Sequence, residues 1–312
     1  MPAPGPGEVL IRIEAAGICG TDRHLFKGEF PCAPPVTLGH EFAGIVLAAG
    51  DGVALAAGTR VTCDPNDWCG DCAECRRGRV NLCERNVATG IHRDGGFAEF
   101  AVFPARRAIT LPADLDPLHG ALCEPLACTL HGLDIGAPVA GERVLVIGGG
   151  VIGLLALQLA QLAGAETMLL TRHPAKRALA GRLGVGETAA TPEEAFRIWP
   201  QGADLTLECA GVPETVAGAA PLTRKGGRVV VLGVLAQGAE VPIEPFDLLF
   251  REIQLRFAFL NPFTQARAAQ LIASGRIKVD ALISRVIALE EAAPAIAAPP
   301  APGEVKVLVV PG

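Results

Sequence analysis

The chain has 312 residues, of which 50% are hydrophobic, and its formal net charge is −6 at pH 7. A chain of this length and apolar content can bury two cores, so we expect two domains. The acidic balance argues against nucleic acid or an anionic membrane as the main partner, because both attract basic surfaces. The opening MPAPGPGEVL has neither the charged nor the apolar region of a secretory signal, and we expect a cytoplasmic protein.

The first 125 residues contain short β-like runs broken by Gly and Pro, which predicts an irregular barrel. Cys19 lies in AGICGTDRH, His40 and Glu41 in TLGHEFAG, and Glu124 in CEPLACTLHG. Thiolate, imidazole and carboxylate groups gathered from distant segments are typical of a catalytic zinc that keeps one position open. Each residue alone has a simpler interpretation, since a lone His before a Glu is usually a turn or a packed side chain.

A compact cysteine segment, CGDCAECRRGRVNLC, predicts a second and closed metal site. Four thiolates this close in sequence can fold back onto one ion and fill its tetrahedral shell, which makes the site structural. Disulfides are the alternative, but they need an oxidising compartment. The four cysteines are Cys69, Cys72, Cys75 and Cys83.

The run VLVIGGGVIGLLALQLAQLAG combines a short apolar strand, a glycine turn and an apolar helix, which is the pattern of a dinucleotide-binding βαβ unit. Gly148 permits the tight turn, Gly150 lets the backbone approach the pyrophosphate, and Gly153 lets the helix pack on the strand. The run is apolar enough to suggest a membrane helix. We reject that interpretation because the glycines interrupt it and buried parallel strands are equally apolar.

From residue 126 onward, strands and helices alternate. The strands VLVIG, TMLLT, LTLECAG and RVVVLG alternate with helices such as AKRALAGRL and ETVAGAAPL, which predicts a parallel sheet with helices on both faces. The helix TQARAAQLIASGRI and the strand EVKVLVV are expected to return to the first domain. Between them, the Ala/Pro-biased residues 291–303 are expected to form a stiff connector. The expected domains are therefore 1–125 plus 260–312, with a zinc lobe at 68–84, and 126–259.

Taken together, these elements resemble the zinc-dependent medium-chain dehydrogenase/reductase family, in its polyol, threonine and sugar dehydrogenase branch. The resemblance runs nearly end to end and includes GEVLIRIEAAGICGTD, TLGHEFAGIV, the cysteine lobe, HRDGGFAEFAVFPA, EPLACTLHG, LECAG and GGRVVVLG. It implies a GroES-like catalytic barrel joined to a Rossmann cofactor domain. It also implies hydride transfer between a secondary alcohol or polyol, or a sugar, and NAD(P), with two zinc ions per chain.

The resemblance also implies roles for individual residues. Positions matching Cys19 and His40 bind the catalytic zinc, and those matching Glu41 and Glu124 ligate it or hold its water. Asp22 would orient a ligand from behind. The residues matching a proton path are Thr21 and His24, although outside the family context turn chemistry would explain both.

Cofactor preference is predicted from the end of the second cofactor strand. Relatives that use NAD place an Asp there, whereas this chain has Thr171 followed by Arg172, with Lys176 and Arg177 nearby. Without the carboxylate, a 2′-phosphate is not repelled and a guanidinium can pair with it, which favours NADP over NAD. The alternative is that these cations form a solvated helix face and Arg172 stacks on adenine. Val151 and Ile152, at the start of the fingerprint helix, complete the expected cofactor contacts.

Relatives usually have about two further strands before the match to GEVLIRI, so we expect an open edge or a loosened barrel here. Relatives are commonly homodimers or homotetramers, and the same is expected of this chain. A catalytically impaired NADPH-binding relative, acting as a redox sensor or structural subunit, is the main alternative function. A zinc-free quinone-reductase-like member is a third, which the ligand set argues against.

Overall fold

The two units of the chain each draw on segments that are distant in sequence. The computed structural model describes residues 1–312. The first unit comprises Met1–Ala127, Asn261–Pro300 and Lys306–Gly312, and the second comprises Cys128–Leu260 and Ala301–Val305. Both ends of the chain therefore belong to the unit that carries the cysteine lobe.

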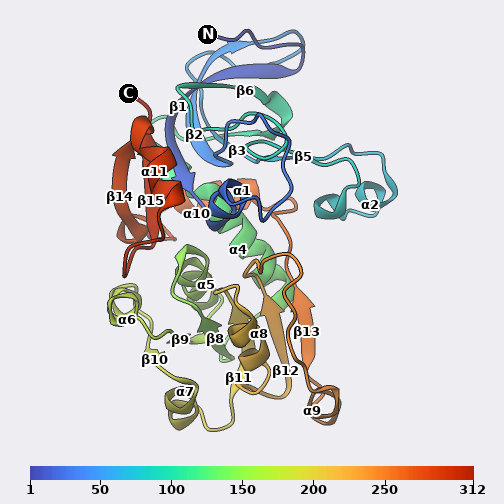
Figure 1. Ribbon diagram of the computed structural model, residues 1–312, viewed down its shortest axis with the longest axis vertical. Coiled ribbons are helices and arrows are strands. Elements are labelled where there is room, and N and C mark those ends of the chain that lie inside the picture. The colour runs from blue at the N-terminus through green and yellow to red at the C-terminus, as the bar shows by residue number, and fades with distance from the viewer. The chain divides into compact units, whose positions relative to one another are not determined.

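The first unit is built on a seven-stranded sheet in which β14, β15, β1, β2, β3 and β7 are neighbours in that order and β6 also pairs with β1. Figure 1 shows the C-terminal strand β15, in red, beside the N-terminal strand β1, in blue. The strands are β1 (Glu8–Ile18), β2 (Glu41–Ala49), β3 (Arg60–Cys63), β6 (Phe100–Pro104), β7 (Ala108–Thr110), β14 (Ile283–Ala288) and β15 (Lys306–Val310).

Strand β1 is the centre of this sheet because it pairs with β6 over its first half, with β15 over its last residues, and with β2 along most of its length. Its sequence EVLIRIEAAGI is apolar enough to be buried between neighbours on either side. Phe42 and Phe103 are fully buried beside it, with ring centroids 5.5 Å apart in an edge-to-face arrangement.

Residues 291–303 are not simply a connector, which corrects the expectation from composition. Within them α11 (Ala292–Ala297) buries Ala292 and Ile296 against Ile18 and Val307 of the sheet. A segment of Ala and Pro shows no amphipathic period, so the sequence did not indicate that its two buried side chains would anchor a short helix.

The remaining elements of the first unit are short. The cysteine lobe contains α2 and η1 and is bordered by the two-stranded pair β4 and β5. Helix α4 begins in the first unit and ends in the second. These elements are α1 (Gly20–Phe26), β4 (Asn66–Asp67), α2 (Ala73–Arg76), η1 (Val80–Leu82), β5 (Val87–Ala88), η2 (Ala105–Arg107), α3 (Pro117–Gly120), α4 (Cys123–Gly136), α10 (Gln265–Ala273), η3 (Asp280–Leu282) and η4 (Leu289–Glu291).

The second unit contains a six-stranded, all-parallel sheet with strand order β10, β9, β8, β11, β12, β13. Within this unit the chain runs from the central strand β8 outward through β9 to β10. It then returns to the centre at β11 and runs outward through β12 to β13 on the other side. The order therefore reverses between β8 and β11, and parallel sheets bind ligands at such a point. The strands are β8 (Arg143–Ile147), β9 (Glu166–Leu170), β10 (Glu187–Ala189), β11 (Ala203–Glu208), β12 (Thr223–Val231) and β13 (Gln254–Phe257).

The parallel sheet predicted from the alternating pattern is confirmed, and its four predicted strands are β8, β9, β11 and β12. The two edge strands were not predicted, because β10 has three residues and the side chains of β13 are mostly exposed. The helices of this unit are α5 (Val151–Leu162), α6 (Pro174–Arg182), α7 (Pro192–Ile198), α8 (Pro213–Ala219) and α9 (Pro245–Phe250).

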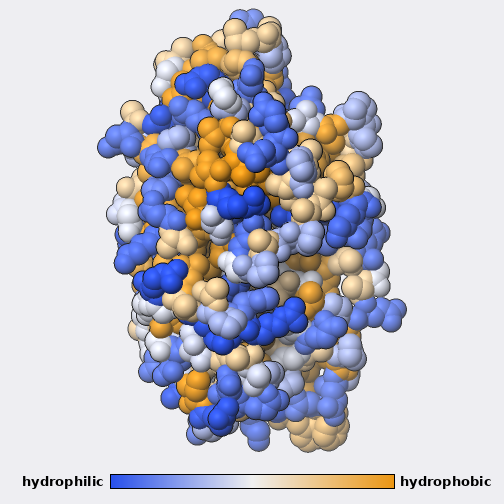
Figure 2. Space-filling model, turned by 60° about the vertical axis from the view of Figure 1, so that its left-hand side comes forward, coloured by the Kyte–Doolittle hydropathy of each residue, from blue (hydrophilic) through white to orange (hydrophobic).

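The apolar run that suggested a membrane helix is divided between β8 and the 12-residue helix α5. No helix of the structure has both the length and the apolar character needed to cross a membrane. On the face drawn in Figure 2, hydrophilic residues in blue are interspersed with smaller orange hydrophobic areas.

Candidate active site

Strands β1 and β2 bring three metal-binding side chains together. Cys19 directly follows β1 and caps α1, whereas His40 directly precedes β2 and Glu41 is its first residue. Because Gly17 pairs with Glu41 across the two strands, their ends meet. One ligand atom from each of Cys19, His40 and Glu41 lies within 4.8 Å of the others. Two ligands of one tetrahedral zinc are about 3.5 Å apart, so small movements would suffice to bind the ion.

Asp22 is fully buried and contacts both Cys19 and His40. Its Oδ2 accepts a hydrogen bond from the Cys19 backbone N–H (2.8 Å), and its Oδ1 lies 3.4 Å from His40 Nδ1. With Nδ1 facing a carboxylate, Nε2 is the ring nitrogen that His40 can offer to a metal. This arrangement matches the supporting role expected for Asp22.

The electrostatics of the group favour a cation. Burial alone would lower the pKa of His40, but the charges of Asp22 and Cys19 outweigh it and raise that pKa well above its ordinary value. Lys306 shows the same balance: burial lowers its pKa, and the attraction of Glu41, Cys19 and Asp22 raises it further than burial lowers it. Anionic side chains that stabilise positive charge in this way fit a divalent ion such as zinc.

Lys306 is the residue of this site that the sequence did not reveal. It begins β15, its side chain is 1% exposed, and its Nζ donates a hydrogen bond to the Ile18 carbonyl oxygen (3.0 Å). It also forms an ion pair with Oε2 of Glu41. The available signal was a single lysine within the otherwise apolar strand VKVLVV, since a lysine is buried only when it is paired.

The other predicted catalytic residues lie on two helices. Glu124 is buried in the first turn of α4, but its carboxylate is not within the set whose ligand atoms all lie within 4.8 Å of one another. Thr21 and His24 are half-buried on α1, directly after Cys19. The Nδ1 atom of His24 lies 2.7 Å from Oε2 of Glu29, which leaves Nε2 facing elsewhere.

The cysteine lobe gathers its four sulfurs around one point. The Sγ atom of Cys69 lies 3.9 Å from that of Cys75 and 3.5 Å from that of Cys83, and the sulfurs of Cys72 and Cys83 are 4.0 Å apart. Sulfurs around a tetrahedral zinc are about 3.8 Å apart, whereas a disulfide bond is about 2.0 Å long. All ten cysteines are free of disulfides. The four thiols therefore fit a closed zinc site.

One cysteine of the lobe, Cys72, is favoured in the thiolate form that binds metal, whereas burial and the neighbouring thiols raise the pKa of Cys75 to about 12. Backbone N–H groups of Cys75 and Glu84 lower the pKa of Cys72 to about 6. The Cys75 N–H donates to the Cys72 sulfur at 3.5 Å and the Cys72 N–H donates to the Cys69 sulfur at 3.4 Å, so the short helix α2 winds around the site.

The glycine fingerprint follows β8, at the reversal point of the parallel sheet. Gly148 has a φ of +104°, which side chains rarely tolerate, and a Cβ on Gly153 would lie 1.9 Å from the Gly148 carbonyl oxygen. Gly150 caps α5 and has open space on its Cβ side. Val151 and Ile152 begin α5 and are half-buried. The free N–H groups of this helix start are a suitable place for a phosphate.

Glu208, at the end of β11, holds the loop beside this turn and was not identified from the sequence. Its fully buried Oε1 accepts hydrogen bonds from the N–H groups of Ala210 (2.8 Å) and Gly211 (2.9 Å) and from the Thr215 hydroxyl (2.7 Å). Ala210 packs so closely on Gly148 that a Cβ there would lie 2.8 Å from its backbone N. Glu208 thus stabilises the wall of the fingerprint turn.

A basic cluster surrounds the end of β9. Thr171 is buried and Arg172 is exposed, and the Arg177 Nη1 donates a hydrogen bond to the Thr171 carbonyl oxygen (2.7 Å). Burial and the positive charges of Lys176, Arg172 and Arg177 lower the pKa of His173. Arg177 is thus tied to the backbone, whereas Arg172 extends into solvent.

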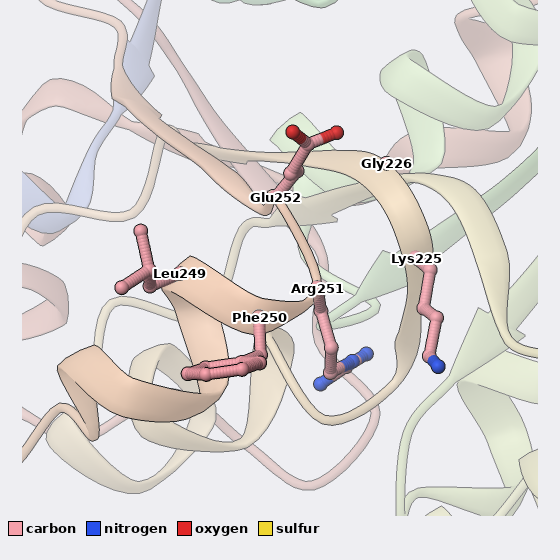
Figure 3. Close-up of a pocket in the computed structure, with 6 residues that line it drawn as sticks. All are labelled: Lys225, Gly226, Leu249, Phe250, Arg251 and Glu252. Carbon is pink, nitrogen blue, oxygen red and sulfur yellow. The ribbon is translucent and has the colours of Figure 1, made fainter.

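A separate hollow of about 590 Å³ lies in the second unit, between the start of β12 and the end of α9 (Figure 3). The Arg251 guanidinium there is already engaged by Asp247 Oδ2 (2.7 Å) and the Ala220 carbonyl oxygen (3.2 Å). No thiol or imidazole lines the hollow, so it lacks a metal-binding group like that of Cys19, His40 and Glu41. Its lining residues are Lys225, Gly226, Leu249, Phe250, Arg251 and Glu252.

The fold and the two metal-binding groups define a zinc-dependent oxidoreductase that uses a nicotinamide dinucleotide. Residues 5–113 match the model of the alcohol dehydrogenase GroES-like domain, and residues 151–274 match that of the zinc-binding dehydrogenase. The chain belongs to the zinc-containing medium-chain alcohol dehydrogenase family, and the expected combination of GroES-like and Rossmann domains is confirmed.

Individual relatives agree with this assignment. The chain is 33% identical over 295 residues to D-arabinitol dehydrogenase 1 of Uromyces fabae, covering 91% of this chain and 84% of that protein. It is 31% identical over 301 residues to L-threonine 3-dehydrogenase of Pyrococcus furiosus, covering 91% and 85%. A crystal structure of a zinc-binding dehydrogenase from Sinorhizobium meliloti 1021, bound to NADP, is similar with a TM-score of 0.96 and 54% identity, covering 99% and 94%.

The fingerprint geometry yields a prediction for Gly153→Ala. The added methyl group would overlap the Gly148 carbonyl oxygen and shift the turn, at a cost of about 1–3 kcal/mol, so we expect NADPH to bind about tenfold more weakly. Fluorescence titration measures the dissociation constant. Gly181→Ala on α6 is the control, because nothing lies within 4 Å of its Cβ, and it should bind as the parent does. Equal affinity in both variants would contradict the role given to Gly153.

Proposed function

We propose that the protein oxidises a secondary alcohol group of a polyol or sugar, reversibly, and passes the hydride to NADP. The group of Cys19, His40 and Glu41 carries this proposal, because it brings three ligand types of a catalytic zinc within 4.8 Å of one another. D-arabinitol and L-threonine, named in two relatives, both carry a secondary alcohol beside other polar groups.

In this proposal Cys19, His40 and Glu41 hold the zinc, and Glu124 ligates it or orients its water. Bound zinc supplies a Lewis acid that polarises the substrate oxygen and makes its hydroxyl proton easier to lose. Asp22 fixes His40 through Nδ1, which keeps Nε2 directed at the metal.

The chain's own proton path begins at Thr21. Its hydroxyl oxygen takes the proton from the substrate alcohol as its own proton is passed on, and His24 is the final acceptor before solvent. Glu29, 2.7 Å from His24 Nδ1, orients the imidazole so that Nε2 receives the proton.

A first experiment counts zinc and measures activity together. The purified chain should contain two zinc ions and reduce NADP with a polyol from a panel. Cys19→Ser should retain the lobe zinc only and lose activity by at least about 100-fold, because the catalytic Lewis acid is absent. Cys32→Ser, which changes a half-buried cysteine outside both groups, is the control and should retain both ions. A parent chain with one zinc, no activity and normal NADPH binding would favour the redox-sensor or structural alternative.

The preference for NADP rests on the basic cluster at the end of β9 and on the absence of a carboxylate at Thr171. The exposed Arg172 is free to reach a 2′-phosphate, and Lys176 and His173 add positive charge or hydrogen-bond donors nearby. The NADP bound to the Sinorhizobium meliloti relative supports the same preference.

Arg172→Ala tests this preference. A charge-assisted hydrogen bond contributes about 1.5–3 kcal/mol, so we expect NADPH to bind more weakly by at least about tenfold while NADH binding is unchanged. Calorimetric titration of both cofactors measures the ratio. Arg182→Ala, at the C-terminal end of α6, should leave the ratio as it was. A parallel loss for both cofactors would show instead that Arg172 stacks on the adenine.

A homo-oligomer is proposed from the free edge of the parallel sheet. Strand β13 pairs only with β12, and Phe257 at its end is 65% exposed. The neighbouring helix α9 exposes Phe246 and Phe250, whose rings stack 4.3 Å apart. An unpaired strand edge beside exposed aromatic rings is suited to pairing with a second copy about a twofold axis.

Phe257→Lys tests this interface. A lysine on each copy would place like charges where the apolar contact forms, so the dimer or tetramer should dissociate to monomers. Light scattering after size-exclusion chromatography gives the mass. Phe196→Lys, at a partly exposed position on α7, is the control and should keep the parent mass. A monomeric parent chain, or an unchanged mass in Phe257→Lys, would exclude this edge as the interface.

A further inference from the structure

Lys306 forms a deeply buried ion pair with Glu41, one of the three candidate ligands of the catalytic metal. Its side chain and that of Glu41 are each 1% exposed. The Nζ atom contacts both segments that supply ligands, because it donates to the Ile18 carbonyl oxygen beside Cys19 (3.0 Å) and pairs with Oε2 of Glu41. A residue from the C-terminal strand thereby connects the ends of β1 and β2.

Stability alone does not account for a lysine at this position. Removing two charges from water costs several kcal/mol per ion, and well-packed apolar residues in place of a buried pair are often as stable or more so. The rest of β15 is apolar, and Val307, Leu308 and Val309 are buried in the same sheet. An apolar residue at position 306 would pack in the core as its neighbours in β15 do. The positive charge of Lys306 therefore needs an explanation other than stability.

The surrounding backbone leaves room for the pair. Gly17 pairs with Glu41 across β1 and β2, and a Cβ on Gly17 would lie 2.3 Å from Glu41 Oε2 and 2.8 Å from Lys306 Cε. Any side chain at position 17 would therefore displace the carboxylate or the lysine. The glycine in AGICG thus has a role in the metal site as well as in the strand.

We propose that Lys306 is a positioning residue that holds Glu41 by Oε2 and leaves only Oε1 for the catalytic metal. A carboxylate tied in this way binds through one oxygen and keeps a coordination position open for the substrate. Without the lysine, Glu41 is free to turn and offer both oxygens, which fills that position. This inference rests on the proposed function, because it takes Cys19, His40 and Glu41 as the ligands of the catalytic ion.

Cobalt substitution tests the proposal by a readout that does not depend on turnover. Co²⁺ is exchanged into the catalytic site while the lobe keeps zinc, which a one-to-one metal ratio verifies. Four-coordinate Co²⁺ absorbs visible light more intensely than five-coordinate Co²⁺. In Lys306→Met we expect cobalt to be retained, its visible bands to lose intensity, and KM for the alcohol to rise more than kcat falls.

Lys278→Met is the matched control, because this lysine is exposed in the same unit and outside the site. Its spectrum should equal that of the parent. Lys306→Gln is the second variant if the methionine variant fails to fold, since an amide can keep the hydrogen bond to the Ile18 carbonyl without the charge, and it should show the same loss of intensity.

These measurements distinguish failure of the proposal for Lys306 from failure of the proposed function. A folded Lys306→Met or Lys306→Gln variant with parental cobalt bands and only a lower melting temperature would overturn the proposal and leave Lys306 a structural role. The same holds if cobalt is lost from both folded variants, because the lysine would then be needed for binding rather than for the mode of ligation. A parent chain that takes up no cobalt outside the lobe would instead contradict the proposed function itself.

Discussion

The pairing of β1 with β2 on one side and with β15 on the other is the constraint on which the catalytic site depends. The register that sets Gly17 against Glu41 and Ile18 against Val307 brings Cys19, His40, Glu41 and Lys306 together, although they come from three separate segments. Because side chains alternate along a strand, a slip of one residue in either pairing would turn Glu41 or Lys306 to the opposite face. The large apolar core around β1 is what keeps that register.

The site also depends on balanced charge. The carboxylates of Asp22 and Glu41 are buried beside the half-buried Cys19, and Lys306 is the one buried lysine among them. Such a cluster is stable only when cations compensate the anions, and a divalent ion completes that compensation. The lobe is simpler, since its four cysteines lie close in sequence and converge around the short helices α2 and η1.

This difference explains how much of the molecule could be predicted from its sequence. The cysteine lobe and the glycine turn are local patterns, and the strands β8, β9, β11 and β12 are apolar runs, so spacing and periodicity were sufficient for them. Lys306, Glu208 and the helix α11 were missed, because their roles depend on which segments meet after folding. The edge strand β13 was not predicted either, because its side chains are mostly exposed and therefore lack the apolar pattern of a buried strand.

We expect two distinct metal sites in each chain, one of them built by strand pairing. Anomalous X-ray diffraction from crystals, recorded on both sides of the zinc absorption edge, tests it most directly. We expect two peaks per chain, one amid the sulfurs of the lobe and one about 2.0–2.3 Å from Cys19 Sγ, His40 Nε2 and Glu41 Oε1. A single peak at the lobe, or a second peak away from Cys19 and His40, would contradict it.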